Sequence, residues 1–375
     1  MITDTLSSPF QKLTQLNWGI FFLILLISAI GWGLLVSAAG GDTHLWAGKQ
    51  VLRFGFGAII MLAIALIDLR WWLHFSYFFY GLSLALLCGV EFLGFIGKGA
   101  ERWIDLYVIQ LQPSELMKIA LVMALARYFH SRPAPLSFQQ LLFPLLLIML
   151  PVILVMRQPD LGTAMILLMS GGALFFLAGV SLWYFGAFLI GLGASIPLLW
   201  SFLHDYQKDR VLTFFDPSQD SLGKGYHITQ SKIALGSGGF WGKGYMQGTQ
   251  ASLNFLPEKQ TDFIFTLLCE EWGFMGGSFL IALYALLIVF CFRIILTTQS
   301  AFGQYVAAGM TMTFFLYVFI NIAMVMGLLP VVGVPLPLVS YGGTAMLTLL
   351  MGFGFLLNIG VHRNLKIPSH SIGIF

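Results

Sequence analysis

The stretch Gly19-Ile-Phe-Phe-Leu-Ile-Leu-Leu-Ile-Ser-Ala-Ile-Gly-Trp-Gly-Leu-Leu-Val-Ser37 contains no charged residue. A helix of about 20 mostly apolar residues is long enough to cross the hydrocarbon core of a bilayer, so this stretch is predicted to span a membrane. Further stretches of similar character follow it: residues 51–67, 71–90, 115–129, 141–156, 161–180, 182–203, 273–292, 306–329 and 342–361. The sequence therefore predicts an all-α polytopic membrane protein with about ten transmembrane helices.

The composition supports a membrane protein. The chain has 375 residues, of which 58% are apolar and only 9% are Asp, Glu, Lys or Arg. Soluble domains average roughly 45–50% apolar and about 25% charged residues. So few charges cannot cover a soluble surface, which excludes a soluble enzyme, a nucleic-acid-binding protein and a disordered chain. The net charge of +3 is too small to indicate a polyanionic partner, so no nucleic acid is expected.

Cysteine and histidine give no sign of a disulfide or a metal centre. The three cysteines, Cys88, Cys269 and Cys291, lie in apolar stretches and have no CxxC spacing. The seven histidines are scattered and form no HExxH pair. We therefore predict that the cysteines are small core residues and that no zinc site exists.

One long polar segment, residues 204–262, separates the seventh predicted helix from the eighth. It holds 12 charged residues and eight glycines. The predicted organisation is a single membrane domain, 1–375, with helices one to seven within 19–203, the loop at 204–262, and helices eight to ten within 263–361. An even number of helices places both termini on one side. Basic residues in the connections on that side, such as Arg70, Arg127 and Arg293, make it cytoplasmic. The long loop is then extracytoplasmic, and the first helix, which lacks a cleavage site, is retained.

The run Gly236-Ser-Gly-Gly-Phe-Trp-Gly-Lys-Gly244 in this loop resembles a phosphate-binding turn. It does not match GxGxxG, because Trp241 occupies the third glycine position, and Lys243 is not followed by Ser or Thr as in a P-loop. We interpret the run as a tight, flexible surface loop whose N–H groups are able to contact an anion.

Charged residues at bilayer depth need a partner or a function, because each costs roughly 2.5–3.5 kcal/mol to insert. Glu115 and Lys118 are spaced i, i+3, so they lie on one helical face. They form either a structural ion pair or a polar floor for a charged headgroup, and the sequence does not separate these hypotheses. Asp160 is best placed to cap the helix that follows it. Of the adjacent Glu270 and Glu271, at least one must face the protein interior.

Asp262 ends the polar loop and is followed by Phe-Ile-Phe-Thr-Leu-Leu-Cys. Desolvation beside apolar residues makes a carboxylate a stronger base. Asp262 is therefore a candidate general base toward a hydroxyl group of a lipid-linked substrate. The alternative interpretation is a helix N-cap.

Motifs in a fixed order along the chain resemble those of the SEDS family (shape, elongation, division, sporulation). They are Gly99-Ala-Glu-Arg-Trp-Ile-Asp105, Gln112-Pro-Ser-Glu115, Gln158-Pro-Asp-Leu-Gly162, Gly223-Lys-Gly-Tyr-His-Ile-Thr-Gln-Ser-Lys-Ile-Ala-Leu-Gly-Ser-Gly-Gly239, Phe255-Leu-Pro-Glu-Lys-Gln-Thr-Asp-Phe-Ile-Phe265 and Leu336-Pro-Leu-Val-Ser-Tyr-Gly-Gly343. The resemblance covers essentially the whole chain. Two further stretches, Gln247-Gly-Thr-Gln250 and Gly333-Val-Pro-Leu-Pro337, resemble the elongation branch of the family and not its division branch.

The resemblance implies a peptidoglycan glycosyltransferase that polymerises lipid II into glycan strands for cell elongation and rod shape. The expected location is the cytoplasmic (inner) membrane, with the reaction on its outer face. The expected partners are a class B penicillin-binding transpeptidase, other membrane proteins of the elongation complex, and membrane lipid. By family motif, Asp262 matches the essential carboxylate, Glu115 and Lys118 match a charged pair, and Arg102 and Asp160 match polar positions near the cavity.

The implied reaction is an inverting β-1,4 transfer that releases undecaprenyl pyrophosphate. It needs a base on the acceptor hydroxyl, for which Asp262 is suited, and neutralisation of the departing pyrophosphate. The candidates for the second task are unranked: Arg102, Lys118, Arg210, Lys232, Lys243 and Lys259. The chain has no Asp-x-Asp dyad, and no metal ligands are assigned. A divalent cation, Mg²⁺ or Mn²⁺, that bridges pyrophosphate to a carboxylate stays an open alternative.

A lipid II flippase is the strongest rival hypothesis, and a passive scaffold for the transpeptidase is another. Transporters commonly contain internal repeats with interrupted helices in corresponding positions. The loop at 204–262 has no counterpart in the first half of the chain, and this asymmetry favours the enzyme. A scaffold would not require a charged loop that ends at a carboxylate.

Overall fold

The computed structural model describes residues 9–93, 95–97, 100–105, 110–132, 136–202, 208, 212, 224–252, 255 and 258–368. Each of the ten predicted spans overlaps a helix, although α12 begins nine residues before the predicted 273–292 and α13 begins five residues before 306–329. The short helix α1 (Pro9–Thr14) precedes them. The helices are α2 (Trp18–Ala38), α3 (Ala47–Leu66), α4 (Leu69–Leu93), α5 (Pro113–His130), α6 (Phe138–Arg157), α7 (Leu161–Leu177), α8 (Leu182–Phe202), α12 (Ile264–Thr297), α13 (Ala301–Val325) and α14 (Gly343–Val361).

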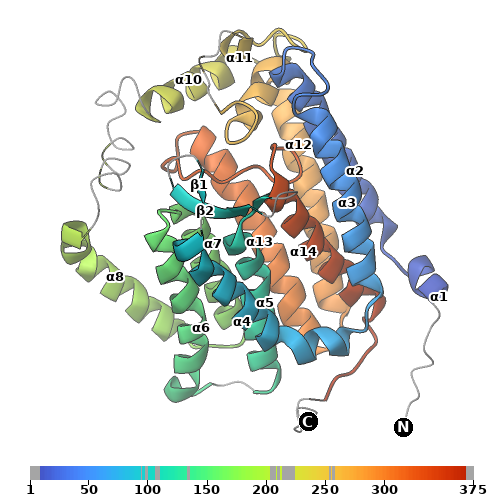
Figure 1. The fold of residues 1–375 in the computed structure, drawn as a ribbon, viewed down its shortest axis with the longest axis vertical. Helices are drawn as coiled ribbons and strands as arrows, with labels where there is room; N and C mark the ends of the chain where they lie inside the picture. The colour runs from blue at the N-terminus through green and yellow to red at the C-terminus, as the bar shows by residue number, and fades with distance from the viewer. Residues whose placement is uncertain are drawn as a thin grey trace.

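The helices form a bundle that is suited to a membrane (Figure 1). Among the described residues, seven helices are long and apolar enough to cross a bilayer: α2, α3, α4, α6, α12, α13 and α14. α7 and the part of α8 from Leu182 to Ser195 are apolar but shorter than the other spans. α5 is less apolar because it carries Glu115, Lys118 and Arg127. The predicted all-α polytopic membrane protein is confirmed.

Helices α5 and α13 lie at the centre of the bundle. Sixteen of the 18 residues of α5 are buried. In α13 78% of the apolar span is buried, against 33–39% in α2, α3, α4, α6 and α12. α5 and α13 pack against each other, and both also contact α7 and α14. The polar residues of α5 are therefore enclosed by protein, which explains why this span is the least apolar.

A small antiparallel sheet that the sequence analysis did not predict connects α4 to α5. It consists of β1 (Phe95–Gly97), β2 (Ala100–Asp105) and β3 (Gln110–Leu111), in that order. Gly97 pairs with Ala100, so only two residues separate β1 from β2. Glycines close to such a short connection favour a hairpin. The sheet lies in the upper part of the bundle, toward helix α10 (Figure 1).

The segment predicted as one long loop, 204–262, is partly helical where it is described. It contains α10 (Lys224–Ser237) and the short α11 (Thr249–Ser252). α10 buries Ile228 and Ala234 and packs on α12 and α13. Ser231 of α10 shares a hydrogen bond of 2.8 Å with Thr266 of α12 and donates one of 2.9 Å to the Val325 carbonyl. The sequence predicts a loop here because glycines and charged residues are frequent in the segment, and α10 corrects that prediction.

Helix α12 is broken at Gly273, which has φ 66° and ψ −162°. In an unbroken helix the N–H groups of Phe274 and Met275 would bond to the carbonyls of residues 270 and 271. Instead, Phe274 N–H donates to the Gly239 carbonyl at 2.9 Å, and Met275 N–H donates to the Phe240 carbonyl at 3.2 Å.

The two helix carbonyls left free by this break are also satisfied by the glycine-rich run. Lys243 N–H donates to the Glu270 carbonyl at 3.0 Å, and Gly244 N–H donates to the Glu271 carbonyl at 2.9 Å. Unsatisfied backbone groups are costly within a membrane protein, so the inserted run 239–244 makes the break tolerable. The N–H groups of Lys243 and Gly244 are therefore not free to contact an anion, which corrects that part of the interpretation of the run.

Glycines are required where the run approaches α12. A Cβ on Gly242, which has φ +82°, would lie 2.1 Å from the Glu271 carbonyl oxygen. A Cβ on Gly238 would lie 2.0 Å from the Cys269 carbonyl oxygen, and one on Gly273 would lie 2.3 Å from the Gly242 nitrogen. Contacts this short exclude a side chain, so the glycines serve backbone-to-backbone packing.

We predict that Gly242→Ala destabilises the protein, because it combines a backbone clash with an unfavourable φ that costs about 1–3 kcal/mol. The measurement is the apparent melting temperature of the purified chain in detergent, which should fall by several degrees. Gly236→Ala is the matched control, since a Cβ there meets nothing within 4 Å. Equal melting temperatures for the two variants would contradict the packing role of Gly242.

Candidate active site

The first two turns of α5 carry a buried ion pair. Pro113 begins the helix, and Glu115 and Lys118 follow on one face. Glu115 is 4% exposed and Lys118 is 3% exposed. The Lys118 ammonium lies 2.6 Å from Oε1 of Glu115. The predicted pairing is thus present, and its burial means that neither charge is solvated by bulk water.

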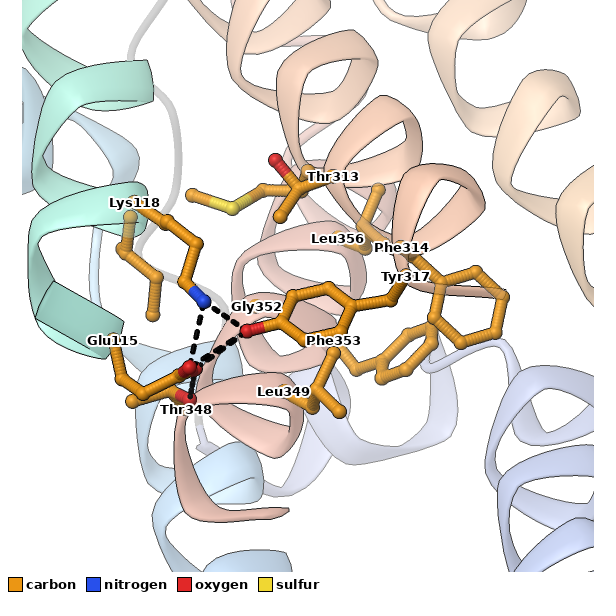
Figure 2. A pocket seen from close by; sticks show the side chains of 12 residues that line it. Glu115, Lys118, Thr313, Phe314, Tyr317, Thr348, Leu349, Gly352, Phe353 and Leu356 are labelled. Carbon is orange, nitrogen blue, oxygen red and sulfur yellow. Dashed lines mark hydrogen bonds and ion pairs between the residues drawn. The ribbon is translucent and has the colours of Figure 1, made fainter. Parts of the chain in front are cut away.

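Two further helices complete the polar cluster around Glu115 (Figure 2). The Tyr317 hydroxyl of α13 lies 2.8 and 2.7 Å from the two carboxylate oxygens of Glu115. The Thr348 hydroxyl of α14 donates to Oε2 at 3.0 Å. Lys118 also contacts the Tyr317 hydroxyl, and its ammonium lies 4.4 Å from the centre of the Tyr317 ring. A buried charge with several such partners is held in one position.

The cluster lies at one end of a small pocket between α5, α13 and α14. The pocket has a volume of about 30 Å³. Its polar lining residues are Glu115, Lys118, Thr313, Tyr317 and Thr348. The rest of the lining is apolar and consists of Ile119, Met310, Phe314, Leu349, Gly352, Phe353 and Leu356. This volume holds roughly two water molecules. Asp262 is not among the lining residues.

Asp262 is partly buried at the end of the turn that leads into α12. Groups outside this turn donate hydrogen bonds to the carbonyls of three successive residues. Tyr341 N–H donates to the Gln260 carbonyl at 2.8 Å, and the Ser340 hydroxyl donates to the Thr261 carbonyl at 2.5 Å. The Asn321 amide donates to the Asp262 carbonyl at 3.0 Å. The motif at 336–343 and helix α13 therefore hold the backbone next to this carboxylate. Phe263, and not Asp262, is the N-cap residue of α12, which has no side-chain cap.

Helix α13 connects the two groups of residues. Tyr317 contacts Glu115, and Asn321, four positions later, contacts the Asp262 backbone. Residues spaced i, i+4 lie on the same face of a helix, about 6 Å apart along its axis. The Glu115 cluster and the Asp262 turn are therefore one helical turn apart on the same side of α13.

Asp160 is the N-cap of α7, as the sequence analysis favoured. Its carboxylate accepts from Thr163 N–H at 3.2 Å and from the Thr163 hydroxyl at 3.0 Å. The Gln112 amide, next to the start of α5, donates to it at 3.3 Å. These contacts tie α7 to the beginning of α5, and a substrate-binding role for Asp160 stays a prediction.

Lys243 and Glu270 form an ion pair that the sequence analysis did not identify. The Lys243 ammonium lies 2.7 Å from Oε1 of the buried Glu270 and 2.9 Å from the Thr249 hydroxyl. The adjacent Glu271 is also buried and accepts from the Ser37 hydroxyl of α2. Both glutamates thus face the interior. Because Lys243 has an internal partner, it is less available to a pyrophosphate than an unpaired cation would be.

The other predicted basic residues are only partly placed by the structure. Lys232 is exposed on α10, and its side chain packs over Gly327. Burial lowers the pKa of the Lys259 ammonium below its ordinary value. Arg102 belongs to strand β2, but its side chain lies outside the described residues, as does the whole of Arg210. Their roles toward a substrate stay predictions.

Sequence reasoning missed four residues of this region: Tyr317, Asn321, Ser340 and Thr348. Tyr317, Asn321 and Thr348 are polar residues within apolar spans, and such residues commonly have an interior role. Their polarity within apolar spans predicts an interior position, but it does not predict which residues they contact.

The described residues contain no group of three or more His, Cys, Asp or Glu side chains arranged to hold a metal ion. A divalent cation held by a carboxylate and the pyrophosphate together stays an open alternative.

Comparisons with known proteins agree over nearly the whole chain. A family model for the cell cycle proteins FtsW, RodA and SpoVE matches residues 11–365. The peptidoglycan glycosyltransferase MrdB of Escherichia coli strain K12 is 45% identical over 350 residues, which cover 92% of this chain and 94% of that protein. This chain belongs to the FtsW/RodA/SpoVE family. The predicted SEDS resemblance is confirmed.

Solved structures of the same family share the fold. The rod shape determining protein RodA of Thermus thermophilus has a TM-score of 0.72 at 28% identity, covering 93% of this chain and 98% of that chain. A chain of a peptidoglycan synthase complex that coordinates polymerization and crosslinking has a TM-score of 0.81 at 31% identity, with coverage of 93% and 98%.

We predict that Glu115 and Lys118 are energetically coupled. Glu115→Leu or Lys118→Met alone leaves an unpaired buried charge, which should cost about 3–5 kcal/mol. The double variant should recover most of the yield and melting temperature of the folded protein. The measurement is a double-mutant cycle on stability in detergent, and losses that simply add would contradict the coupling. A folded double variant without activity would assign the pair to substrate binding, whereas an active one would make it structural.

Proposed function

We propose that this chain is a peptidoglycan glycosyltransferase that polymerises lipid II into glycan strands, with Asp262 as the general base. The observation that carries the proposal is the placement of the Asp262 turn one helical turn from the buried Glu115 and Lys118 cluster. The 45% identity to a protein named peptidoglycan glycosyltransferase supports the same activity.

In the proposed reaction, a carboxylate oxygen of Asp262 takes the proton from the acceptor hydroxyl. The hydroxyl oxygen then forms a bond to the anomeric carbon of the donor sugar. The bond from that carbon to the lipid pyrophosphate breaks, and the pyrophosphate leaves with the electron pair. One displacement of this kind inverts the anomeric carbon, and a positioned base typically contributes about 10²–10⁴-fold to the rate.

Cations near the Asp262 turn would neutralise the charge that develops on the pyrophosphate. Lys259 lies in the same turn and is partly desolvated, so its attraction to an anion is less screened by water. Lys232, Arg102 and Arg210 are further candidates. Lys118 is held by Glu115 and is better suited to stabilise the pocket than to follow a departing group.

We further propose that the chain works in the cytoplasmic (inner) membrane with both termini in the cytoplasm and the segment 204–262 outside. α10 and α11 lie at the upper end of the view, away from α1 and the C-terminal end of α14 (Figure 1), as this orientation requires. The proposed partner is a class B penicillin-binding transpeptidase. The similarity to a chain of a peptidoglycan synthase complex that coordinates polymerization and crosslinking supports this partner.

We predict that Asp262→Asn lowers polymerisation of fluorescent lipid II by about 10²–10⁴-fold, because the amide cannot accept the proton. The assay uses the purified full-length chain, and its readout is glycan polymer separated by gel. Asp42→Asn is the control, since this carboxylate is exposed in the connection between α2 and α3. A folded Asp262→Asn variant that polymerises at the wild-type rate would refute the assignment. Translocation of lipid II across vesicles without polymer formation by the wild-type chain would instead indicate the flippase.

A further inference from the structure

Asn321 is a buried polar residue within an apolar stretch of α13, between Ile320 and Ile322. Its side chain is 0% exposed. A buried amide is costly unless it forms hydrogen bonds, so its partners indicate why it is present. The Nδ2 group donates to the Asp262 carbonyl at 3.0 Å and to the Val334 carbonyl at 2.7 Å. One side chain therefore joins the Asp262 turn to the segment between α13 and α14.

The hydrogen bond from Asn321 to the Val334 carbonyl holds the backbone that lies next to the Asp262 carboxylate. Val334 follows Gly333, which has φ +74°. A Cβ built on Gly333 would lie 3.6 Å from Oδ2 of Asp262, so the Gly333 backbone borders the carboxylate. Asn321 therefore links the backbone of the residue that bears the carboxylate to the backbone of this border. The absence of a side chain at Gly333 leaves room for a group to approach Oδ2.

We propose that Asn321 is a positioning residue that holds the Asp262 carboxylate at its working distance from Gly333, where the acceptor hydroxyl enters. This inference rests on the proposed function, because it assumes that Asp262 is the base. Asn321 does not touch the reacting atoms and acts through the backbone of residues 262 and 334. Loss of its two hydrogen bonds should therefore lower the rate of the chemical step more than the affinity for lipid II.

The chain contains a matched control for a purely structural role. Asn358 of α14 is also 0% exposed, and its Nδ2 group donates to the carbonyls of Ile64 at 2.9 Å and Ala65 at 3.2 Å, and to that of Ile67. These contacts tie α14 to the end of α3, and none involves the Asp262 turn. The same substitution at Asn358 removes the same kind of buried hydrogen bonds without altering the base.

The test compares Asn321→Leu with Asn358→Leu in the purified full-length chain, using fluorescent lipid II and normalising to folded protein. Leucine has the same number and branching of side-chain heavy atoms as asparagine but donates no hydrogen bond. Both variants should lower the melting temperature. Misplacement of a reacting group by about 1 Å can cost on the order of 10²-fold in rate, so kcat should fall by up to that factor in Asn321→Leu with KM little changed. Asn358→Leu should retain kcat.

A double variant separates this inference from the proposed function. If Asn321 acts through Asp262, adding Asn321→Leu to Asp262→Asn should lower the residual rate no further. The positioning role would be overturned if Asn321→Leu kept the wild-type kcat. It would also be overturned if Asn358→Leu lost as much kcat as Asn321→Leu, or if the losses of rate in the double variant were additive. An Asp262→Asn variant that polymerises at the wild-type rate would instead overturn the assignment of Asp262 as the base, on which this inference rests. If Asn321→Leu does not fold, Asn321→Ser, which retains one donor, should show an intermediate kcat, and a wild-type kcat there would also overturn the role.

Discussion

The centre of this structure depends on the ion pair and hydrogen bonds of the buried Glu115 carboxylate. An ionised group is costly at this depth unless it is paired and hydrogen-bonded. Glu115 meets that requirement with Lys118 from its own helix, Tyr317 from α13 and Thr348 from α14. Because each partner comes from a fixed place, the carboxylate sets the rotation of α13 and α14 against α5. The apolar surfaces of these helices alone would not specify one orientation so strictly.

The orientation of α13 then determines where Asp262 lies. With Tyr317 turned toward Glu115, Asn321 one turn later must face the same side, and it bonds to the Asp262 carbonyl. The motif at 336–343 supports the same turn through Ser340 and Tyr341. This motif is itself packed closely, since a Cβ on Gly31 of α2 would lie 2.7 Å from Val339 Cα. Motifs far apart in the sequence thus converge on the backbone around one carboxylate.

Much of this architecture follows from the sequence. The parts that the sequence does not predict share one cause. Apolar length predicts the long helices of the bundle, seven of which are long and apolar enough to cross a bilayer among the described residues. The i, i+3 spacing predicts the Glu115–Lys118 pair, and the position of Asp160 before an apolar run predicts its cap. These are local patterns. The contacts of Tyr317 and Asn321 depend on how three helices are rotated against one another, which no local pattern contains. The role of the run 236–244 is also not local, because its glycines pack against α12, a helix that begins 20 residues later.

The same contacts bear on whether the bundle suits an enzyme or a transporter. Alternating access requires one part of a bundle to move against another around a fixed site. Here, backbone hydrogen bonds from the run 239–244 cross the break in α12, and side chains from α13 and the 336–343 motif hold the Asp262 turn. A movement of α12 against α13 would break several of these bonds together. A held carboxylate is what general-base catalysis needs, since a preorganised group requires little rearrangement when the proton moves. The interrupted helix, which in a transporter would mark a moving part, is held at its break by four backbone hydrogen bonds to the run 239–244.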